Sequence, residues 1–224
     1  MKHLERDLEQ LHRQILALSA SVEETIDKAG RALRERRMDL AEQVLAGDDD
    51  IDRRDVQIEE ECLKMLALHQ PVAIDLRRIA AVLKINTDLE RIGDLAANIA
   101  ERAKYLIDHP EFPIPTKLER MIDMATMMVR GALGSFVNLD TKAARRICGL
   151  DDEVDQYNRE IIEELYEVMR RNTDWIPAAM HCFSASRHVE RIADHATNIA
   201  EDVIYLVEGE IARHKHDGVH LPAE

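Results

Sequence analysis

The sequence predicts an all-α protein built as two repeated antiparallel three-helix bundles, with six long helices in its 224 residues. Aromatic residues make up only 4% of the chain, which disfavours a sheet protein because strands are rich in aromatic and β-branched side chains. Eight glycines and six prolines are too few to interrupt the chain often, so the helices must be long. A segment of the third helix returns in the sixth, which indicates a duplication.

The expected helix boundaries follow from caps and turn residues. Asp39 and Asp140 precede long periodic segments and are predicted N-caps. Pro71 and Thr173 each open the helix that follows a turn. The six helices are expected at residues 3–36, 39–69, 72–108, 116–136, 140–171 and 174–208. Helices of this length joined by short turns must run antiparallel.

A proline-rich linker separates the two repeats. Three prolines within residues 110–115 cannot continue a helix, because proline lacks the amide donor. The first repeat is therefore expected at residues 1–109, and the second at residues 116–224, ending in a polar tail. Residues 89–106 and 189–206 are identical at 11 of 18 positions, more than unrelated helices share, and residues 48–52 match residues 151–155.

Acidic side chains recur along one face of four of these helices, since residues four apart share a helix face. The four stripes are Asp48, Asp52 and Asp55; Glu90, Asp94, Asn98 and Glu101; Asp151, Asp155 and Asn158; and Glu190, Asp194, Asn198 and Glu201. Like charges at this spacing cost roughly 0.2–0.5 kcal/mol per pair. If neighbouring helices bring two stripes together, their oxygens suit hard cations such as magnesium, manganese, calcium or iron. The alternative is a set of solvated faces offset by Arg91 and Arg191.

The acidic composition limits the classes of function. A formal charge of −14 argues against nucleic-acid binding, which needs clustered Lys and Arg. Three separated cysteines fit neither a disulfide framework nor a thiolate metal site. The first residues are charged throughout and no apolar run reaches the length of a membrane span, so the expected location is the cytoplasm. His181, His188 and His195 are expected to pack at the edge of the apolar face rather than to bind metal.

Three segments together carry a resemblance to a known family. Residues 70–79, with the sequence QPVAIDLRRI, are followed by residues 88–94, DLERIGD, and residues 98–101, NIAE. In this combination the chain resembles the PhoU family of accessory and regulatory proteins of bacterial high-affinity phosphate transport, over nearly its whole length. The resemblance implies a PhoU-like fold of two three-helix repeats.

The resemblance also implies a function and partners. Family members are negative regulators of phosphate uptake and of the phosphate-starvation (Pho regulon) response, acting between the phosphate ABC transporter and a sensor histidine kinase. The expected partners are therefore the ATPase subunit of the transporter, the kinase and a second copy in a homodimer, with the membrane reached only through them. Asp75, Arg77 and Arg78 are candidate partner-binding residues. The second repeat lacks this Asp-Leu-Arg pattern at residues 176–178, so partner contacts are expected on the first.

Some family members hold multinuclear iron or zinc clusters with motifs of the form Glu/Asp-x-x-x-Asp. Four pairs here match that form: Asp48 with Asp52, Glu90 with Asp94, Asp151 with Asp155, and Glu190 with Asp194. Iron, zinc, manganese and magnesium are all candidates, with Asp55, Asn98, Glu101, Asn198 and Glu201 as additional ligands. Because Asn158 stands where the first repeat has Asp55, the second site is expected to be the weaker.

Two other classes of function stay open. The first is a metal-dependent enzyme that uses the carboxylates to activate water or oxygen. The sequence has no Gly-rich phosphate loop, nucleophile elbow, Cys–His pair or HExxH motif, so catalysis has little support and a non-enzymatic regulator is expected. The second is a helical scaffold whose acidic faces bind no metal.

Overall fold

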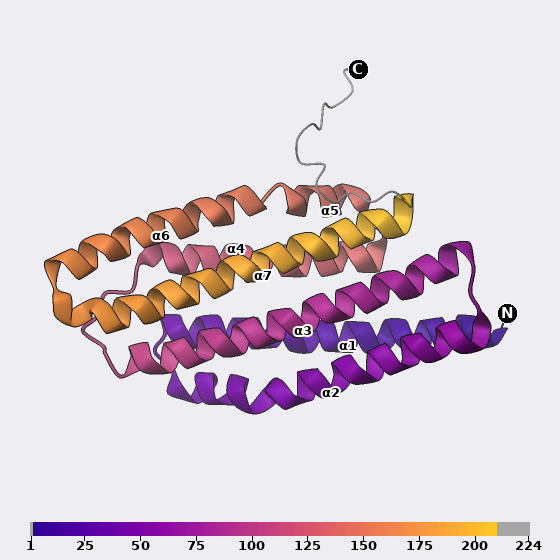
Figure 1. The fold of residues 1–224 in the computed structure, drawn as a ribbon, viewed down its shortest axis with the longest axis horizontal. Helices are drawn as coiled ribbons and strands as arrows, with labels where there is room; N and C mark the ends of the chain where they lie inside the picture. The colour runs from indigo at the N-terminus through magenta and orange to yellow at the C-terminus, as the bar shows by residue number, and fades with distance from the viewer. Residues whose placement is uncertain (1, 210–224) are drawn as a thin grey trace, which may run out of the picture.

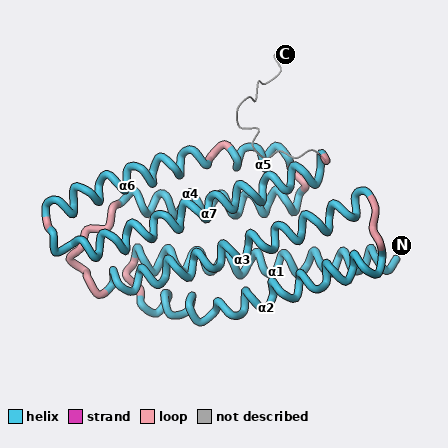
Figure 2. The backbone as a smooth tube through the Cα atoms, in the orientation of Figure 1, coloured by secondary structure: helices cyan, strands magenta, loops and turns pink. Residues whose placement is uncertain are grey.

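The computed structural model describes residues 2–209, and within them the chain is helical, without strands (Figures 1 and 2). The helices are α1 (Lys2–Arg34), α2 (Met38–His69), α3 (Ala73–Ile107), α4 (Thr116–Asn138), α5 (Thr141–Cys148), α6 (Asp151–Arg171) and α7 (Ile176–Glu208), with a short 3-10 turn η1 (Thr173–Trp175) before α7. The all-α fold of two three-helix repeats is confirmed. The predicted polar tail, residues 210–224, lies outside the described residues.

The two repeats lie side by side with their helices along the long axis of the molecule (Figure 1). In the first repeat α3 packs on α1 and α2, and in the second α7 packs on α4, α5 and α6. Helices α3 and α7 are also each other's main contact, so they form the seam between the repeats. Apolar residues at helical spacing, such as Ile85, Leu89 and Ile92 of α3, are fully buried.

Polar side chains cross this seam at two places. Lys84 of α3 forms an ion pair with Asp202 of α7, whose side chain is only 2% exposed. His195 Nδ1 of α7 lies 2.8 Å from Asp88 Oδ1 of α3. The histidine expected at the edge of the apolar face is thus a contact between the repeats.

One predicted helix is divided. Residues 140–171 were expected to form a single helix, but α5 ends at Cys148 and α6 begins at Asp151. Gly149 has low helix propensity, and the acidic residues at the start of α6 are stabilised by a helix N-terminus. Both features favour a new helix start.

The two predicted N-caps have different outcomes. Asp140 caps α5, since its carboxylate accepts hydrogen bonds from the amides of Lys142 and Ala143 at 3.0 Å each. Asp39 is not a cap, because α2 begins one residue earlier at Met38. Its carboxylate instead accepts hydrogen bonds of 2.7 and 2.6 Å from the guanidinium of Arg37.

Candidate metal centre

Three carboxylates predicted from the sequence converge between α2 and α3. Asp52 projects from α2, Glu90 and Asp94 project from α3, and each offers one oxygen within 4.8 Å of the other two. Asp48 lies one turn before Asp52, and the negative charges of Asp52 and Asp94 help to raise its pKa. We call Asp48, Asp52, Glu90 and Asp94 the first acidic cluster.

A glycine allows α2 and α3 to approach closely at this point. A Cβ atom on Gly93 would lie only 3.1 Å from Ile51 Cδ1, tighter than ordinary contacts. Ile51 immediately precedes Asp52 and Gly93 immediately precedes Asp94, so the close approach brings these carboxylates together. The corresponding residue of the second repeat is Ala193.

The first acidic cluster is repulsive in the absence of a cation. Desolvation raises the pKa of Asp48 and of Glu90, and the neighbouring carboxylates raise both further. Arg91 offsets part of this repulsion, with Nε 3.4 Å from Glu90 Oε2 and Nη1 3.6 Å from Asp94 Oδ2. A bound cation would remove the remaining repulsion between the carboxylates.

Asp55 lies one turn beyond Asp52, where a buried amide holds it. Asn86 Nδ2 of α3 donates to Asp55 Oδ1 at 2.6 Å and to its backbone carbonyl at 2.9 Å. Desolvation and the charges of Glu59 and Asp52 raise the pKa of Asp55. Asp55 thus fixes α2 against α3 beside the cluster.

The second repeat places the equivalent carboxylates differently. We call Asp155, Glu190 and Asp194 the second acidic cluster. Unlike Asp52, Glu90 and Asp94, these three described residues do not each place an oxygen within 4.8 Å of the other two. Arg187 Nη1 donates to Glu190 Oε1 at 2.6 Å. Arg159 Nη1 lies 4.0 Å from Asp155 Oδ2.

A neutral amide also binds Glu190, since Asn158 Nδ2 donates to its Oε1 at 3.1 Å. Desolvation raises the pKa of Glu190, while Arg187 opposes the rise. Desolvation and the charge of Asp155 raise the pKa of Asp194. Arg187 therefore supplies within the chain the positive charge that the first acidic cluster would take from a cation.

Four of the other predicted ligands point elsewhere. Glu101 is exposed, with Oε2 3.3 Å from Arg102 Nη2, and Asn198 Nδ2 faces Asp88 Oδ1 across the seam at 3.4 Å. Asp151 and Glu201 both lie near Cys148. Desolvation, and then the charges of Glu201 and Asp151, raise the pKa of the Cys148 thiol to about 11. Asn98 stays beside the first acidic cluster, but its Nδ2 donates to the backbone carbonyl of Asp94 at 2.9 Å.

The donor set of the first acidic cluster fits a hard cation. Asp52, Glu90 and Asp94 supply only carboxylate oxygens, which suit magnesium, manganese, calcium and iron(II), whereas structural zinc sites prefer nitrogen and sulfur. Glu90 is mostly but not fully buried and Asp52 is exposed, so the site is open to solvent on the Asp52 side. Asp52, Glu90 and Asp94 would hold the ion, with Asp48 next to them.

The predicted partner-binding residues lie together at the start of α3. Arg78 Nη1 lies 3.8 Å from Asp75 Oδ1, and both side chains are partly exposed. The guanidinium of Arg77 instead lies against Gly209, where its Nη1 would be 3.3 Å from a Cβ atom. Arg77 thus connects α3 to the end of α7.

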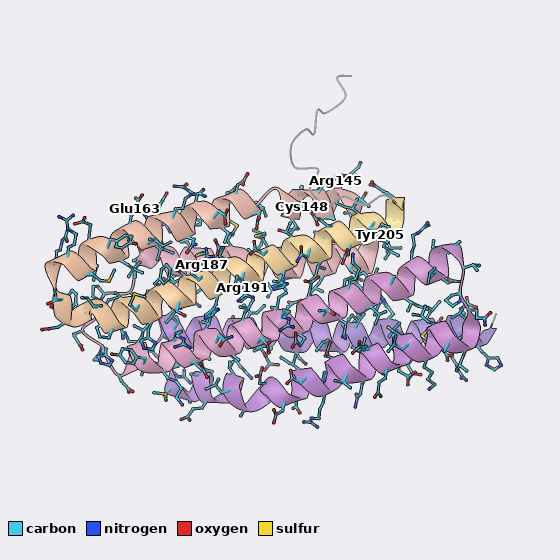
Figure 3. All side chains as sticks on the ribbon, viewed as in Figure 1. Arg145, Cys148, Glu163, Arg187, Arg191 and Tyr205 are labelled. Carbon is cyan, nitrogen blue, oxygen red and sulfur yellow. The ribbon has the colours of Figure 1, made fainter. Side chains whose placement is uncertain are left out.

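Sequence reasoning missed two residues that decide the difference between the clusters. Arg187 neutralises Glu190, and the aligned residue of the first repeat is Thr87; Figure 3 labels Arg187 and Arg191 along the middle of α7. Gly93 permits close helix packing where the second repeat has Ala193. Both signals were present as departures between the two aligned repeats.

The fold and the site together define an all-helical tandem-repeat protein with an open carboxylate cluster on its first repeat. In residues 2–209 no helix combines the length and apolarity that crossing a membrane requires. The PhoU domain family model matches residues 4–103 and 118–203.

Similar proteins and structures agree with this match. A "Phosphate-specific transport system accessory protein PhoU homolog" of Aquifex aeolicus is 43% identical over 94% of this chain and 96% of its own length. The "Phosphate-specific transport system accessory protein PhoU" of Escherichia coli is 32% identical over 93% of this chain and 86% of its own length. The crystal structure of PhoU from Pseudomonas aeruginosa superimposes with a TM-score of 0.88 at 36% identity, covering 92% of this chain and 99% of that one. The chain therefore belongs to the PhoU family.

Proposed function

We propose that this protein is an accessory regulator of phosphate transport that restrains phosphate uptake and the phosphate-starvation response. It would relay the state of a phosphate ABC transporter to a sensor histidine kinase, as a homodimer in the cytoplasm and without catalytic turnover. One observation carries the proposal: relatives named as phosphate-specific transport system accessory proteins match this chain over more than nine-tenths of its length.

An exposed apolar surface on the first repeat is the proposed partner contact. Large apolar side chains gather at the turn between α2 and α3; Leu68 is 69% exposed and Val72 is 75% exposed, with Ile74 and Leu76 beside them. Exposed apolar groups in this density are typical of protein interaction sites. Asp75 and Arg78 border them, so we name Leu68, Val72, Ile74, Leu76, Asp75 and Arg78 the turn surface.

Backbone conformation supports a functional role for the turn surface. Gln70 and Ala73 both adopt left-handed conformations, with φ of 44° and 49°. Such conformations are unfavourable for residues other than glycine, and they persist where the surrounding structure requires them. The second repeat has no such non-glycine residue between α6 and α7.

The first acidic cluster would connect metal binding to partner binding. A cation held by Asp52, Glu90 and Asp94 would remove the repulsion between α2 and α3 and fix their relative position. The same two helices carry the turn surface at their connected ends. Metal would therefore shape the partner contact without taking part in a reaction.

Binding of purified partners tests this function. The full chain is immobilised, and the ATPase subunit of a phosphate ABC transporter and the cytoplasmic part of its sensor kinase are passed over it. We expect binding of at least one partner, a loss of at least tenfold in affinity for Val72→Asp, and wild-type affinity for Ile176→Asp, the matched control on the second repeat, where Ile176 is 42% exposed.

Absence of binding by both partners would contradict the relay. Equal losses in the two variants would contradict the turn surface as the contact. The same assay after chelation tests the metal's part, since a metal-free scaffold predicts unchanged affinity. Turnover of a phosphorylated substrate that depends on added metal would favour the enzyme instead.

A further inference from the structure

The seam between α3 and α7 has two ends that the sequence repeat relates to each other. Because α3 and α7 are antiparallel and aligned residues lie 100 apart, each contact at one end has a counterpart at the other. At the first end Lys84 forms its ion pair with the buried Asp202. The Lys84 ammonium also lies 5.8 Å from the centroid of the Tyr205 ring, and Figure 3 labels that tyrosine near the end of α7. The cation at this end is thus matched by an acid across the seam.

The second end lacks that match. Asp202 corresponds to Arg102 of α3, Lys84 corresponds to Ser184 of α7, and Tyr205 corresponds to Tyr105. By this correspondence, the position that would pair with Arg102 holds a neutral hydroxyl, where an acid would complete the pattern. Among the described residues the acid that it contacts is Glu101, its exposed neighbour in sequence, at 3.3 Å.

Two histidines of α7 complete this second end. His181 stacks on Tyr105, with ring centroids 3.9 Å apart and planes 10° apart. His188 Nε2 lies 3.2 Å from Ser184 Oγ. Three buried nitrogens, Arg102 Nε, His181 Nδ1 and His188 Nδ1, make no hydrogen bond to any described residue. Arg102 Nε is always a donor, and each histidine Nδ1 donates or accepts according to its tautomer. Buried polar atoms normally have partners, so Arg102 in particular calls for an acceptor.

Positive charge from both repeats acts at this end of the seam. After desolvation, the charge of Arg102 is the largest cause that lowers the pKa of both His181 and His188. Arg191 lowers the pKa of His188 further, and Glu101 opposes it. This concentration of cationic groups lies in a chain whose formal charge is −14.

We propose that Arg102, His181, Ser184 and His188 form a binding site for a small tetrahedral oxyanion, with inorganic phosphate as the first candidate. A guanidinium and a hydroxyl are strong donors to phosphate oxygens. When His188 donates from Nε2 to Ser184 Oγ, the Ser184 hydroxyl is free to donate to the anion, and His181 adds a donor when its proton is on Nδ1. The Arg102 side chain is 32% exposed, so a ligand from solvent reaches it. An oxyanion held by Arg102 on α3 and by Ser184 on α7 would bridge the two repeats. This inference goes beyond the proposed relay, because it concerns a ligand of the chain itself.

Titration calorimetry on the full, metal-free chain tests the site with inorganic phosphate as the probe. We expect saturable binding by the wild type and at least tenfold weaker binding by Arg102→Gln. Ser184→Asp should weaken binding as much, because its carboxylate supplies Arg102 with the acid that Lys84 already has at the other end. Arg130→Gln is the matched control, since Arg130 pairs with Glu23 between α1 and α4 at 3.1 Å.

Parallel titrations with sulfate and glycerol phosphate define the ligand class. Equal binding of sulfate supports a general oxyanion site, and binding of glycerol phosphate supports one that also admits phosphate monoesters. Absence of saturable binding by all three anions would overturn the proposal. Wild-type affinity in a folded Arg102→Gln or Ser184→Asp variant would overturn it as well. No transporter or kinase is present, so failure here leaves the proposed relay intact.

Discussion

One substitution made in both repeats should change stability by different amounts. Glu90→Gln removes a charge from a repulsive cluster, whereas Glu190→Gln removes the partner of an arginine. In chelator, the first change should therefore stabilise the protein, whereas the second should give little net change, because the lost attraction to Arg187 offsets the relief of burying a charge. Both residues are aligned in the repeat, on α3 and α7, and both side chains are more than three-quarters buried at 23% and 14% exposure.

The magnitude at position 90 follows from the distances. At 4.8 Å, each repelling pair costs about 0.9 kcal/mol in the dielectric of water. Glu90→Gln relieves two such pairs and loses one attraction to Arg91 at 3.4 Å, worth about 1.2 kcal/mol on the same scale. The net gain is about 0.6 kcal/mol, or about 1–2 °C in Tm for a chain of this size.

At position 190 the loss comes from a charged hydrogen bond. Glu190 accepts from Arg187 at 2.6 Å and from Asn158 at 3.1 Å. Charged hydrogen bonds contribute about 1.5–3 kcal/mol, and the 47% exposure of Arg187 reduces this to about 1 kcal/mol. Desolvation raises the pKa of Glu190 despite Arg187, so the relief of burying a charge offsets this loss and little net change in Tm is expected.

Thermal unfolding followed by circular dichroism, with and without manganese, measures both effects. Manganese at about 100 times its Kd should stabilise the wild type by about 2.7 kcal/mol. Glu190→Gln should keep this gain and Glu90→Gln should lose most of it. A fall in Tm for Glu90→Gln in chelator, or an equal manganese effect in both variants, would refute the reasoning.

Three further predictions follow from the same geometry. The raised pKa values of Asp48 and Glu90 mean that the folded state holds their protons more tightly than the unfolded state does. In metal-free protein their contribution to stability is therefore favourable at low pH and is lost as the pH rises through the raised pKa. The Tm advantage of Glu90→Gln should accordingly disappear, in a pH series of thermal melts, as the pH falls from about 7 to about 4. Arg187→Thr, which copies Thr87, should give the second acidic cluster measurable manganese affinity by calorimetry; unchanged binding would contradict its role as an internal cation. Gly93→Val should push Ile51 away from α3. We expect urea unfolding to show a free energy of unfolding lower by about 1–3 kcal/mol, together with weaker manganese binding. A stable variant with full manganese affinity would show that this close packing is not required.

The sequence predicted the fold because its signals are local and repeated. Long periodic segments, few helix breakers and the prolines of residues 110–115 were enough to place most helix boundaries within a few residues. The break between α5 and α6 escaped prediction, since Gly149 alone is tolerated in many helices and α2 passes through Gly47 without ending. Asp39 failed as a cap because Arg37 offers its carboxylate a stronger partner.

Spacing identified the acidic residues but could not determine how they meet. Asp52, Glu90 and Asp94 converge as the stripes suggested. Asn198 and Glu201 do not join their stripe, because α7 packs against helices of both repeats and its polar residues there face α3 or α5. A stripe on one helix carries no information on how many neighbours surround that helix.

Manganese titration followed by electron paramagnetic resonance tests whether the first acidic cluster is a cation site. The wild type is compared with Glu90→Gln/Asp94→Asn and with the matched variant Glu190→Gln/Asp194→Asn. We expect tight binding in the wild type, its loss in the first variant and its retention in the second. Retention in the first variant, or equal loss in both, would contradict it.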